Sequence, residues 1–522
     1  MLRLTWVQPE DLIGHELRQA TQDGREPSAI AARWQAAAGP DAPHHAGASA
    51  TPASPYLRLL ATDLLDELAD LPSRLSDEEP TDLTRIKSLC PHWPPAPASR
   101  PTPPTPTLHE QPPPHTPTLR GQSPPRASVL RGQSCRWGDG GPPARAKPRV
   151  GEGGRDGTPA APGCATTPRA PHPASLEAAW LGRAVGCLLG KPVEKLPLTA
   201  IRQLAKATGN WPLRTYFTAH GVPQDLLTRH PWNRRSATTS LAENIDGMPE
   251  DDDLNYPLLN LLVLQRHTRA FTPTDVATVW LDELPAGRTF TAERIAYRNL
   301  LSGLEPPLTA RHHNPFREWI GALIRADVHG WTNPGDPAAA AEQAHRDATL
   351  THTANGVYAA MFTAAVIATA ATGDHDVHAC LRTGLTVVPP RSRLAHAVRQ
   401  AVGLAHRHTD FDTVVDALHA TYAATHHWVH AVPNTALIAA ALTHADGDFT
   451  GSIRRAVSGG WDTDSNGATA GSIAGLLAGS PRALPEHWTA PLKNRLATSV
   501  GDFHGTGFDT LAQLTHLEAT RP

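Results

Sequence analysis

Cysteine is scarce in this chain, and neither sign of charge is in clear excess. The 522 residues include five cysteines with no Cys-x-x-Cys spacing: Cys90, Cys135, Cys164, Cys187 and Cys380. This distribution excludes a disulfide framework and a cysteine-based zinc site. The formal net charge of −3 at pH 7 gives no reason to expect nucleic acid or an anionic membrane as the main partner.

Long apolar runs and strand-like alternation are also missing. Residues 1–7 lack the apolar core of a signal peptide. The apolar stretch 357–371 is short and rich in alanine and threonine, so we interpret it as a buried helix and not as a membrane span. No run of alternating β-branched residues is long enough to predict a sheet. We therefore expect a cytoplasmic protein without membrane segments.

Proline, in contrast, is abundant and unevenly placed, which divides the chain into three parts. Residues 91–173 are rich in proline and glycine, and they repeat Leu-Arg-Gly-Gln-Ser at 119–123 and 130–134. Such a segment buries too little apolar surface to offset its ordering entropy, so we expect a disordered linker. A tether for a proline-binding module or an anionic partner is the functional alternative.

Helical patterns lie on both sides of this linker. In residues 1–90, apolar positions recur at i, i+3 and i+4 over 11–20 and 57–71, and a short helix is expected at 83–89. We expect this smaller region to dock through an apolar face of Trp6, Trp34, Leu57, Leu60, Leu64 and Leu65. Residues 174–522 predict helices at 275–284, 338–350, 357–371, 393–407, 412–426 and 436–444. The predicted fold class is therefore all-α.

Residues 458–467 form the most informative stretch. A Gly-Gly turn precedes Asp462, Thr463, Asp464 and Ser465, and glycine then recurs at every fourth position at 467, 471, 475 and 479. This spacing predicts a helix that another helix approaches closely. Oxygen ligands at the start of such a helix suit hard cations such as Mg²⁺. The alternative is that Asp462 or Asp464 only caps the helix.

A second acidic cluster precedes another apolar segment. Glu250, Asp251, Asp252 and Asp253 come directly before the run 258–264. Four adjacent like charges repel one another unless they are solvated or neutralised by a cation. The alternative is an acidic first turn favoured by the helix dipole. Two such clusters, each opening a core helix, predict the two halves of one binuclear metal site.

Three segments in a fixed order resemble the ADP-ribosylglycohydrolases, a family that includes the enzyme that reactivates dinitrogenase reductase. Residues 182–194 end in Gly-Cys-Leu-Leu-Gly-Lys-Pro-Val-Glu, which is similar to the family's Gly-Asp-x-x-Gly-x-x-x-Glu. Residues 250–253 stand where the family has Thr-Asp-Asp-Thr, and residues 462–465 match Asp-x-Asp-Thr/Ser. The resemblance spans roughly residues 174–500.

The resemblance implies a compact orthogonal multi-helix bundle that uses two Mg²⁺ or Mn²⁺ ions. The metal ligands that we expect are Glu250, Asp251, Asp252, Asp253, Asp462, Asp464 and Ser465. The expected catalytic residues are Asp252, Asp464 as a bridge between the ions, and Glu194 as general acid–base or water-positioning group. The resemblance also implies substrate contacts from Gly321 and Arg325 near the diphosphate, and from His352, Asn355, Gly356 and Tyr358 near the adenosine.

The chain departs from the family pattern at three of these positions. Cys187 replaces the aspartate of the opening motif, while Glu250 and Asp253 replace the two threonines of the second motif. A carboxylate can still offer an oxygen to a metal in place of a threonine. We therefore expect a divergent hydrolase that cleaves the N- or O-glycosidic bond between ADP-ribose and a protein or small-molecule acceptor. Two alternatives stay open: hydrolysis of another riboside or nucleotide-sugar metabolite, and a non-catalytic metal-binding scaffold.

Overall fold

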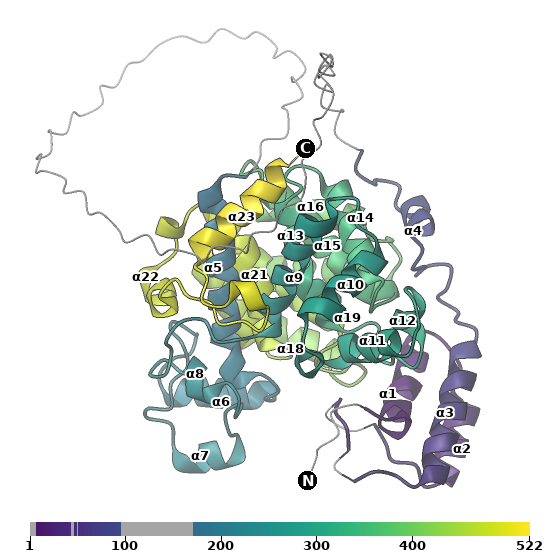
Figure 1. Cartoon of the computed structure of the whole chain (residues 1–522). Helices are drawn as coiled ribbons and strands as arrows, with labels where there is room; N and C mark the ends of the chain where they lie inside the picture. Colours follow the sequence, from purple (N-terminus) through teal and green to yellow (C-terminus); the bar gives the residue numbers. More distant parts are fainter. Residues whose placement is uncertain (1–6, 43–45, 50, 96–170, 522) are drawn as a thin grey trace, which may run out of the picture. The chain divides into compact units, whose positions relative to one another are not determined.

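Every regular element in the described part of the chain is a helix (Figure 1). The computed structural model describes residues 7–42, 46–49, 51–95 and 171–521. Within these ranges, β-pairing is limited to two isolated bridges, Met248 with Leu496 and Trp319 with His430. The prediction of an all-α fold is confirmed. Most of the predicted linker 91–173, and Trp6, lie outside the described residues.

Four helices make up the N-terminal region. Ser54 and Asp82 cap the third and fourth of these helices by accepting hydrogen bonds from backbone N–H groups of the first turn, as N-terminal polar residues commonly do. The helices are α1 (Pro9–Gln22), α2 (Ser28–Ala36), α3 (Pro55–Asp70) and α4 (Leu83–Leu89).

The other helices lie between residues 173 and 520. The first group is α5 (Pro173–Gly190), α6 (Leu198–Ala207), α7 (Gln224–Arg229), α8 (Ala237–Ser240), α9 (Asp252–His267), α10 (Pro273–Glu283), α11 (Thr291–Leu301) and α12 (Leu308–Arg311). The second group is α13 (Asp327–Trp331), α14 (Pro337–Ala348), α15 (Ala354–Ala370), α16 (Val377–Thr386), α17 (Arg393–Arg407), α18 (Phe411–Tyr422), α19 (Ala431–His444), α20 (Phe449–Ser458), α21 (Thr463–Ala478), α22 (Glu486–Thr489) and α23 (Phe508–Thr520). Six short 3₁₀ turns join them: η1 (Lys191–Val193), η2 (Ala286–Arg288), η3 (Ile320–Arg325), η4 (Pro481–Ala483), η5 (Ala490–Leu492) and η6 (Gly501–Phe503).

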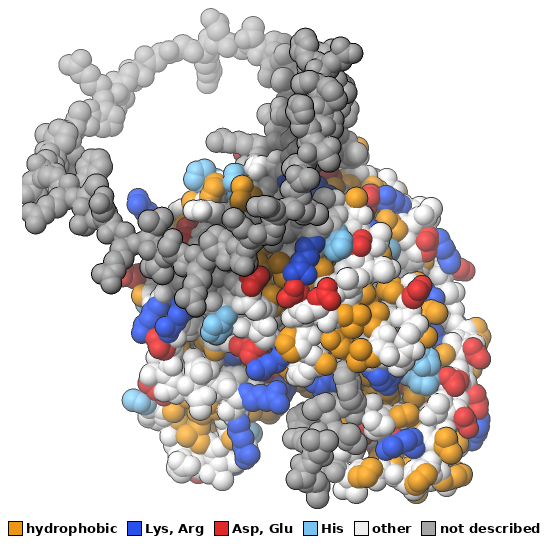
Figure 2. Space-filling view, in the orientation of Figure 1, with side chains coloured by type: hydrophobic (Ala, Val, Ile, Leu, Met, Phe, Trp, Pro, Cys, Tyr) orange, Lys and Arg blue, Asp and Glu red, His pale blue; other side chains and the backbone are white. Residues whose placement is uncertain are grey.

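The apolar helix α15 lies in the core and is buried along nearly its whole length. Its burial agrees with the interpretation of residues 357–371 as a core helix. Among the described residues, no helix combines the length and the apolar character that crossing a membrane requires. In the face shown in Figure 2, acidic and basic side chains of the described residues are interspersed and form no large patch of one sign.

Helices α5 and α21 touch backbone to backbone, which confirms the close approach predicted from the glycine spacing. A Cβ atom built on Gly467 would lie 2.2 Å from the carbonyl oxygen of Gly186, and one on Gly471 would lie 2.0 Å from that of Gly182. Only glycine permits such contacts. The Thr463 hydroxyl donates to the Gly190 carbonyl at 2.8 Å, which fixes the start of α21 against the end of α5.

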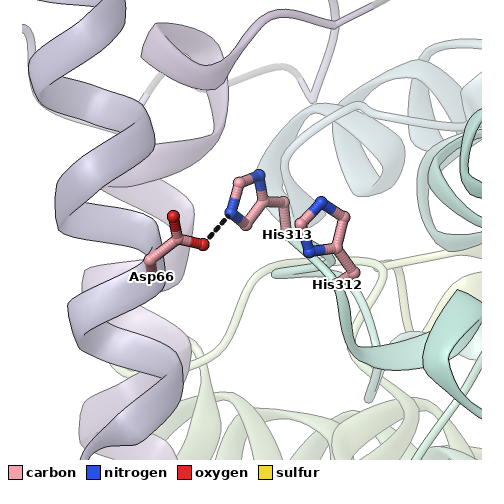
Figure 3. Close-up of side chains that lie close together, drawn as sticks. All are labelled: Asp66, His312 and His313. Carbon is pink, nitrogen blue, oxygen red and sulfur yellow. Dashed lines mark hydrogen bonds and ion pairs between the residues drawn. The ribbon is translucent and has the colours of Figure 1, made fainter. Parts of the chain in front are cut away.

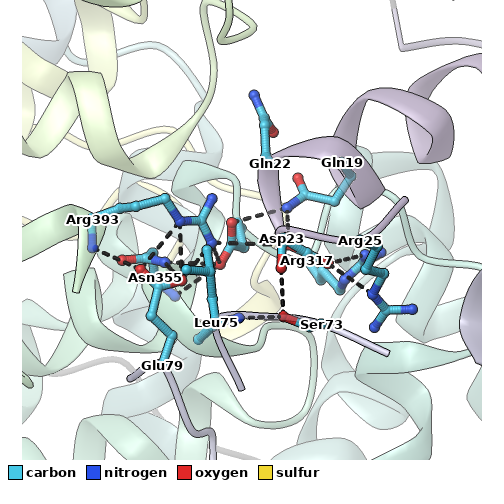
Figure 4. A network of polar contacts seen from close by, with 12 residues as sticks. Gln19, Gln22, Asp23, Arg25, Ser73, Leu75, Glu79, Arg317, Asn355 and Arg393 are labelled. Atoms are coloured by element: carbon cyan, nitrogen blue, oxygen red, sulfur yellow. Dashed lines mark hydrogen bonds and ion pairs between the residues drawn. The ribbon is translucent and has the colours of Figure 1, made fainter. Parts of the chain in front are cut away.

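The N-terminal region docks on the following helices through buried ion pairs (Figure 4). Arg317 donates to Glu16 at 2.7 Å and to Asp23 at 2.6 Å. Arg393 donates to Glu79 at 2.6 Å and also contacts Glu318. Docking was expected through an apolar face; of its residues, Trp34, Leu64 and Leu65 are buried, and Trp34 packs against Gly39 and Pro40 within the N-terminal region itself. The charged contacts were not predicted.

Candidate metal centre and active-site cavity

The two acidic segments open helices α9 and α21. Asp251 caps α9, because its Oδ1 accepts a hydrogen bond of 2.9 Å from the Asp253 N–H. Asp462 stands at the same position before α21 but makes no capping hydrogen bond with its side chain. The capping alternative was raised for Asp462 and Asp464, and the Asp462 side chain does not cap α21. Capping is instead found at Asp251, for which it was not predicted.

A strained turn positions Asp462. Gly460 and Trp461 both have positive φ, 79° and 58°, and such a value is unusual for a tryptophan. The Trp461 ring stacks on the His419 ring with 4.2 Å between centroids, and the Asp462 N–H donates to the Asn434 side chain at 3.2 Å. These contacts hold the strained backbone in place, as is common near functional sites.

Three carboxylates converge at this point. Glu194, from the turn after α5, Asp462 and Asp464 each present an oxygen within 4.8 Å of the others. Asp462 and Asp464 are 6% and 7% exposed. Like charges at this separation repel, and burial removes the water that would screen them. The donor set therefore fits a hard divalent cation, which takes carboxylate oxygens as ligands.

The protonation of these groups reflects the same crowding. Burial, together with the charges of Glu194 and Asp251, raises the pKa of Asp464 to about 7. Burial and the neighbouring Asp464 hold the pKa of Asp462 well above its usual range. Burial and the charges of Asp251 and Asp464 do the same to the pKa of Asp252. Each of these shifts is one that a bound cation would reverse.

The neighbouring carboxylates have cationic partners within the protein. The Lys191 ammonium contacts Asp251 Oδ2, and Arg183 donates to Asp253 Oδ1 at 3.2 Å. Burial alone would raise the pKa of Asp251, but the Lys191 charge lowers it. Cys187 is fully buried, and its Sγ lies 4.0 Å from Asp253 Oδ2. Asp251 and Asp253 thus each contact a basic side chain, whereas Asp252 makes no ion pair with a described residue.

A cavity of about 820 Å³ opens over both acidic segments. Of the predicted site residues, eight line it: Glu194, Glu250, Asp251, Asp252, Gly321, Asp462, Asp464 and Ser465. Asp253 does not line it, because its carboxylate turns to Arg183. Residues Ala46, Gly47 and Ala48 of the N-terminal region contribute to the cavity wall. The site is therefore built from both parts of the described chain.

Sequence reasoning missed the basic and aromatic lining of this cavity. Trp319 and His427 stack with 4.3 Å between ring centroids at an interplanar angle of 11°. The basic lining residues, apart from Lys191, are Lys195, Arg235, Arg288 and Arg294. These residues stand in segments without a recognisable motif, so only their position in the fold identifies them.

Arg325 does not lie in the cavity. It is fully buried and donates to Glu293 at 2.9 Å and to Asp347 at 2.6 Å. The segment forms the 3₁₀ turn η3, in which positions three apart share a face, so Gly321 and Ile324 line the cavity together. Arg325, one position further on, turns into the core. The predicted contact between Arg325 and the diphosphate is therefore not supported by this placement.

The four residues predicted near the adenosine also lie outside this cavity: His352, Asn355, Gly356 and Tyr358. All four are buried. The Asn355 side chain donates to Glu79 at 2.8 Å and to Glu318 at 3.0 Å, while the Tyr358 hydroxyl donates to the Pro80 carbonyl. Burial and the charge of Arg325 hold the pKa of His352 well below its usual range. Asn355 and Tyr358 thus contact the N-terminal region, and their role with substrate stays a prediction.

A histidine cluster lies elsewhere, at the junction with the N-terminal region (Figure 3). His313 Nε2 and Asp66 Oδ1 are 2.7 Å apart, and the His312 ring stacks on the His313 ring with 4.0 Å between centroids. Ring nitrogens coordinate a metal in the plane of the ring at about 2.0–2.1 Å. The nitrogens of two nearly parallel rings do not converge on one ion, so this cluster serves as a docking contact.

The comparison with family models agrees with the motifs. The model of a family described as ADP-ribosylglycohydrolase matches residues 171–521. A solved structure described as an ADP-ribosylglycohydrolase-related protein complex is similar to this chain, with 21% sequence identity and a TM-score of 0.40; the match covers 67% of this chain and 98% of that one. No curated protein matches.

Proposed function

Because the chain belongs to the ADP-ribosylglycohydrolase family, we propose that it is a divalent-metal-dependent hydrolase that releases ADP-ribose from an acceptor. Membership of the family implies a glycohydrolase. The metal dependence and the bond to ADP-ribose are the proposal. The observation that carries it is the convergence of Glu194, Asp462 and Asp464 in a cavity that basic and aromatic side chains also line.

The chemistry follows from the carboxylates. Cleavage of an N- or O-glycosidic bond at ribose passes through an oxocarbenium-like state and needs an activated water. When bound, Mg²⁺ or Mn²⁺ would orient ribose hydroxyls and lower the pKa of a coordinated water. Glu194 is held by Asn233, which donates to Oε2 at 2.8 Å, and by Lys195 at 2.8 Å from Oε1. In our proposal Glu194 acts as the general acid–base or positions the nucleophilic water.

The rest of the cavity suits an adenosine diphosphate group. Lys195, Arg288 and Arg294 line it together with the acidic cluster, and such side chains bind phosphate oxygens through charge-assisted hydrogen bonds. The stacked pair Trp319 and His427 offers an aromatic surface in the same cavity. The cavity therefore supports a substrate with an aromatic base and an anionic linker, such as an ADP-ribosylated protein or small molecule.

The test is hydrolysis of ADP-ribosylated arginine, ADP-ribosylated serine and ADP-ribose-1″-phosphate by the purified full chain. Each reaction is run with Mg²⁺, with Mn²⁺ and with excess chelator, and free ADP-ribose is followed. Release that requires the metal is the expected result, and the substrate that reacts names the acceptor. A chain that binds metal but releases ADP-ribose from none of the three contradicts the proposed substrate.

Cys187 favours one second candidate, a hydrolase of a different riboside or nucleotide-sugar metabolite. Its thiol is fully buried beside Asp253, where the family pattern has a carboxylate, so the surroundings of Asp253 carry one negative charge less than that pattern would give. Extending the substrate panel to other N- and O-ribosides separates the two candidates. If the chain binds no metal and cleaves none of these substrates, only the scaffold alternative is left.

A further inference from the structure

Asp251 already binds a cation that belongs to the chain. Lys191 contacts Asp251 Oδ2, and its ammonium lies 3.5 Å from the Glu250 carbonyl oxygen. The Lys191 and Asp251 side chains are 9% and 7% exposed. The other carboxylate oxygen of Asp251 accepts the Asp253 N–H. Both oxygens are therefore engaged before any external ion arrives.

Asp253 is paired with Arg183, a cation that it shares with Asp327. The guanidinium is fully buried and donates to the Asp253 carboxylate at 3.2 Å and to the Asp253 carbonyl at 2.6 Å. It also donates to the Asp327 carboxylate at 2.9 Å. A buried arginine held by two carboxylates stays charged. It is thus a permanent counter-charge beneath this half of the site.

The other half of the site has no comparable cation. Among the described residues, no lysine or arginine lies within ion-pair distance of Asp252, Asp462 or Asp464. Glu194 pairs with Lys195, but the Lys195 side chain is 45% exposed, so solvent screens its charge more than that of the buried Lys191. The carboxylates without a cationic partner are therefore Asp252, Asp462 and Asp464, and the last two converge with Glu194.

We propose that this chain holds one divalent ion, on Glu194, Asp462 and Asp464, and that Lys191 with Arg183 supplies the positive charge a second ion would bring. The proposal refines the proposed function and rests on it. It departs from the two ions expected from the sequence. The physical reason is that an ammonium group and a divalent cation on the same buried carboxylate repel each other strongly.

The number of bound ions tests this directly and needs no substrate. The full chain is stripped of metal, titrated with Mn²⁺, and the tightly bound Mn²⁺ per chain is counted by calorimetry and by the electron paramagnetic resonance signal of free Mn²⁺. We expect one ion per wild-type chain. Lys191→Met, which removes the charge but keeps an apolar stem, should bind two, and Lys191→Arg should bind one.

A matched control is Lys493→Met, which removes a surface lysine whose side chain is 60% exposed and should leave one bound ion. Two ions in the wild-type chain overturn the inference and leave the proposed hydrolase intact, whereas no bound ion overturns the metal dependence itself. An unchanged single ion in Lys191→Met also contradicts the role of Lys191. If that variant does not fold, the wild-type count decides alone.

Discussion

Asp464 is the residue on which the proposed centre depends most. Replacing it with asparagine removes one negative charge but keeps the size and the backbone contacts of the side chain. We expect Asp464→Asn to lose divalent-metal binding and turnover while its circular dichroism stays that of a helical protein. Asp225→Asn is the control, because the Asp225 side chain is 76% exposed and far from the cluster in sequence. Normal turnover in Asp464→Asn would contradict the metal assignment.

The raised pKa of Asp464 makes metal binding sensitive to pH. Burial and nearby carboxylates raise this pKa to about 7, so below that pH the group carries a proton that an ion must displace. The affinity of the metal-free chain for Mn²⁺ should fall by at least about tenfold for each pH unit below this pKa, because Asp462, whose pKa is also raised, has to release a proton as well. Calorimetric titrations across neutral pH check this. A flat profile would show that Asp464 binds the ion without releasing a proton.

Single residues also show where sequence reasoning succeeds and where it stops. The two acidic segments are visible because consecutive carboxylates need a cation or solvent wherever they are placed. Arg325 was expected near the diphosphate. The direction of its side chain depends on whether residues 320–325 form a 3₁₀ helix, with three residues per turn, or an α-helix, with 3.6, and the sequence does not reveal which of the two forms. Trp319 and His427 are distant in the chain, and only the fold stacks them.

At the scale of elements, the contact between α5 and α21 is the most sensitive to substitution. A Cβ on Gly467 would lie 2.2 Å from a backbone oxygen of α5, so Gly467→Ala must push the helices apart. Overpacking costs about 1–3 kcal/mol and occasionally more. Alanine gains up to about 1 kcal/mol over glycine in helix propensity, which is smaller. We therefore expect a net loss of stability, measured by urea unfolding, and weaker Mn²⁺ binding because α21 carries Asp464.

Gly501→Ala provides the control for this contact. No atom lies within 4 Å of a Cβ built at Gly501, and its φ is not positive. Its unfolding midpoint should equal that of the wild type or rise slightly. Equal effects of the two substitutions would show that close helix packing is not the cause.

The positions of helices in the sequence were easier to predict than the helices against which they pack. The periodicity placed α10, α14, α15, α17, α18 and α19 within a few residues of their observed bounds. The glycine spacing predicted a close neighbour for α21 without naming it. Gly182, Gly186 and Gly190 recur at the same interval of four residues, and pairing the two stripes would have identified α5 as that neighbour.

At the scale of the whole molecule, Arg317 joins the N-terminal region to the rest of the described chain. Removing one partner of a buried ion pair costs about 3–5 kcal/mol, because the other charge stays buried without compensation. Arg317→Met should therefore lower thermal stability strongly and expose the N-terminal helices to limited proteolysis. Arg33→Met is the matched control, since Arg33 and Glu67 are 52% and 44% exposed and such pairs contribute about 0–1 kcal/mol. Equal melting temperatures would contradict the docking role of Arg317.

The wall formed by Ala46, Gly47 and Ala48 has a practical consequence for anyone who wishes to shorten the chain. The family match begins at residue 171, yet these three residues, which precede the matched range, line the cavity. A protein cut at that boundary would lose one side of its pocket, and Arg317 would lose both Glu16 and Asp23. The smallest fragment that keeps this cavity wall and these ion pairs is therefore discontinuous and contains two separate pieces of polypeptide.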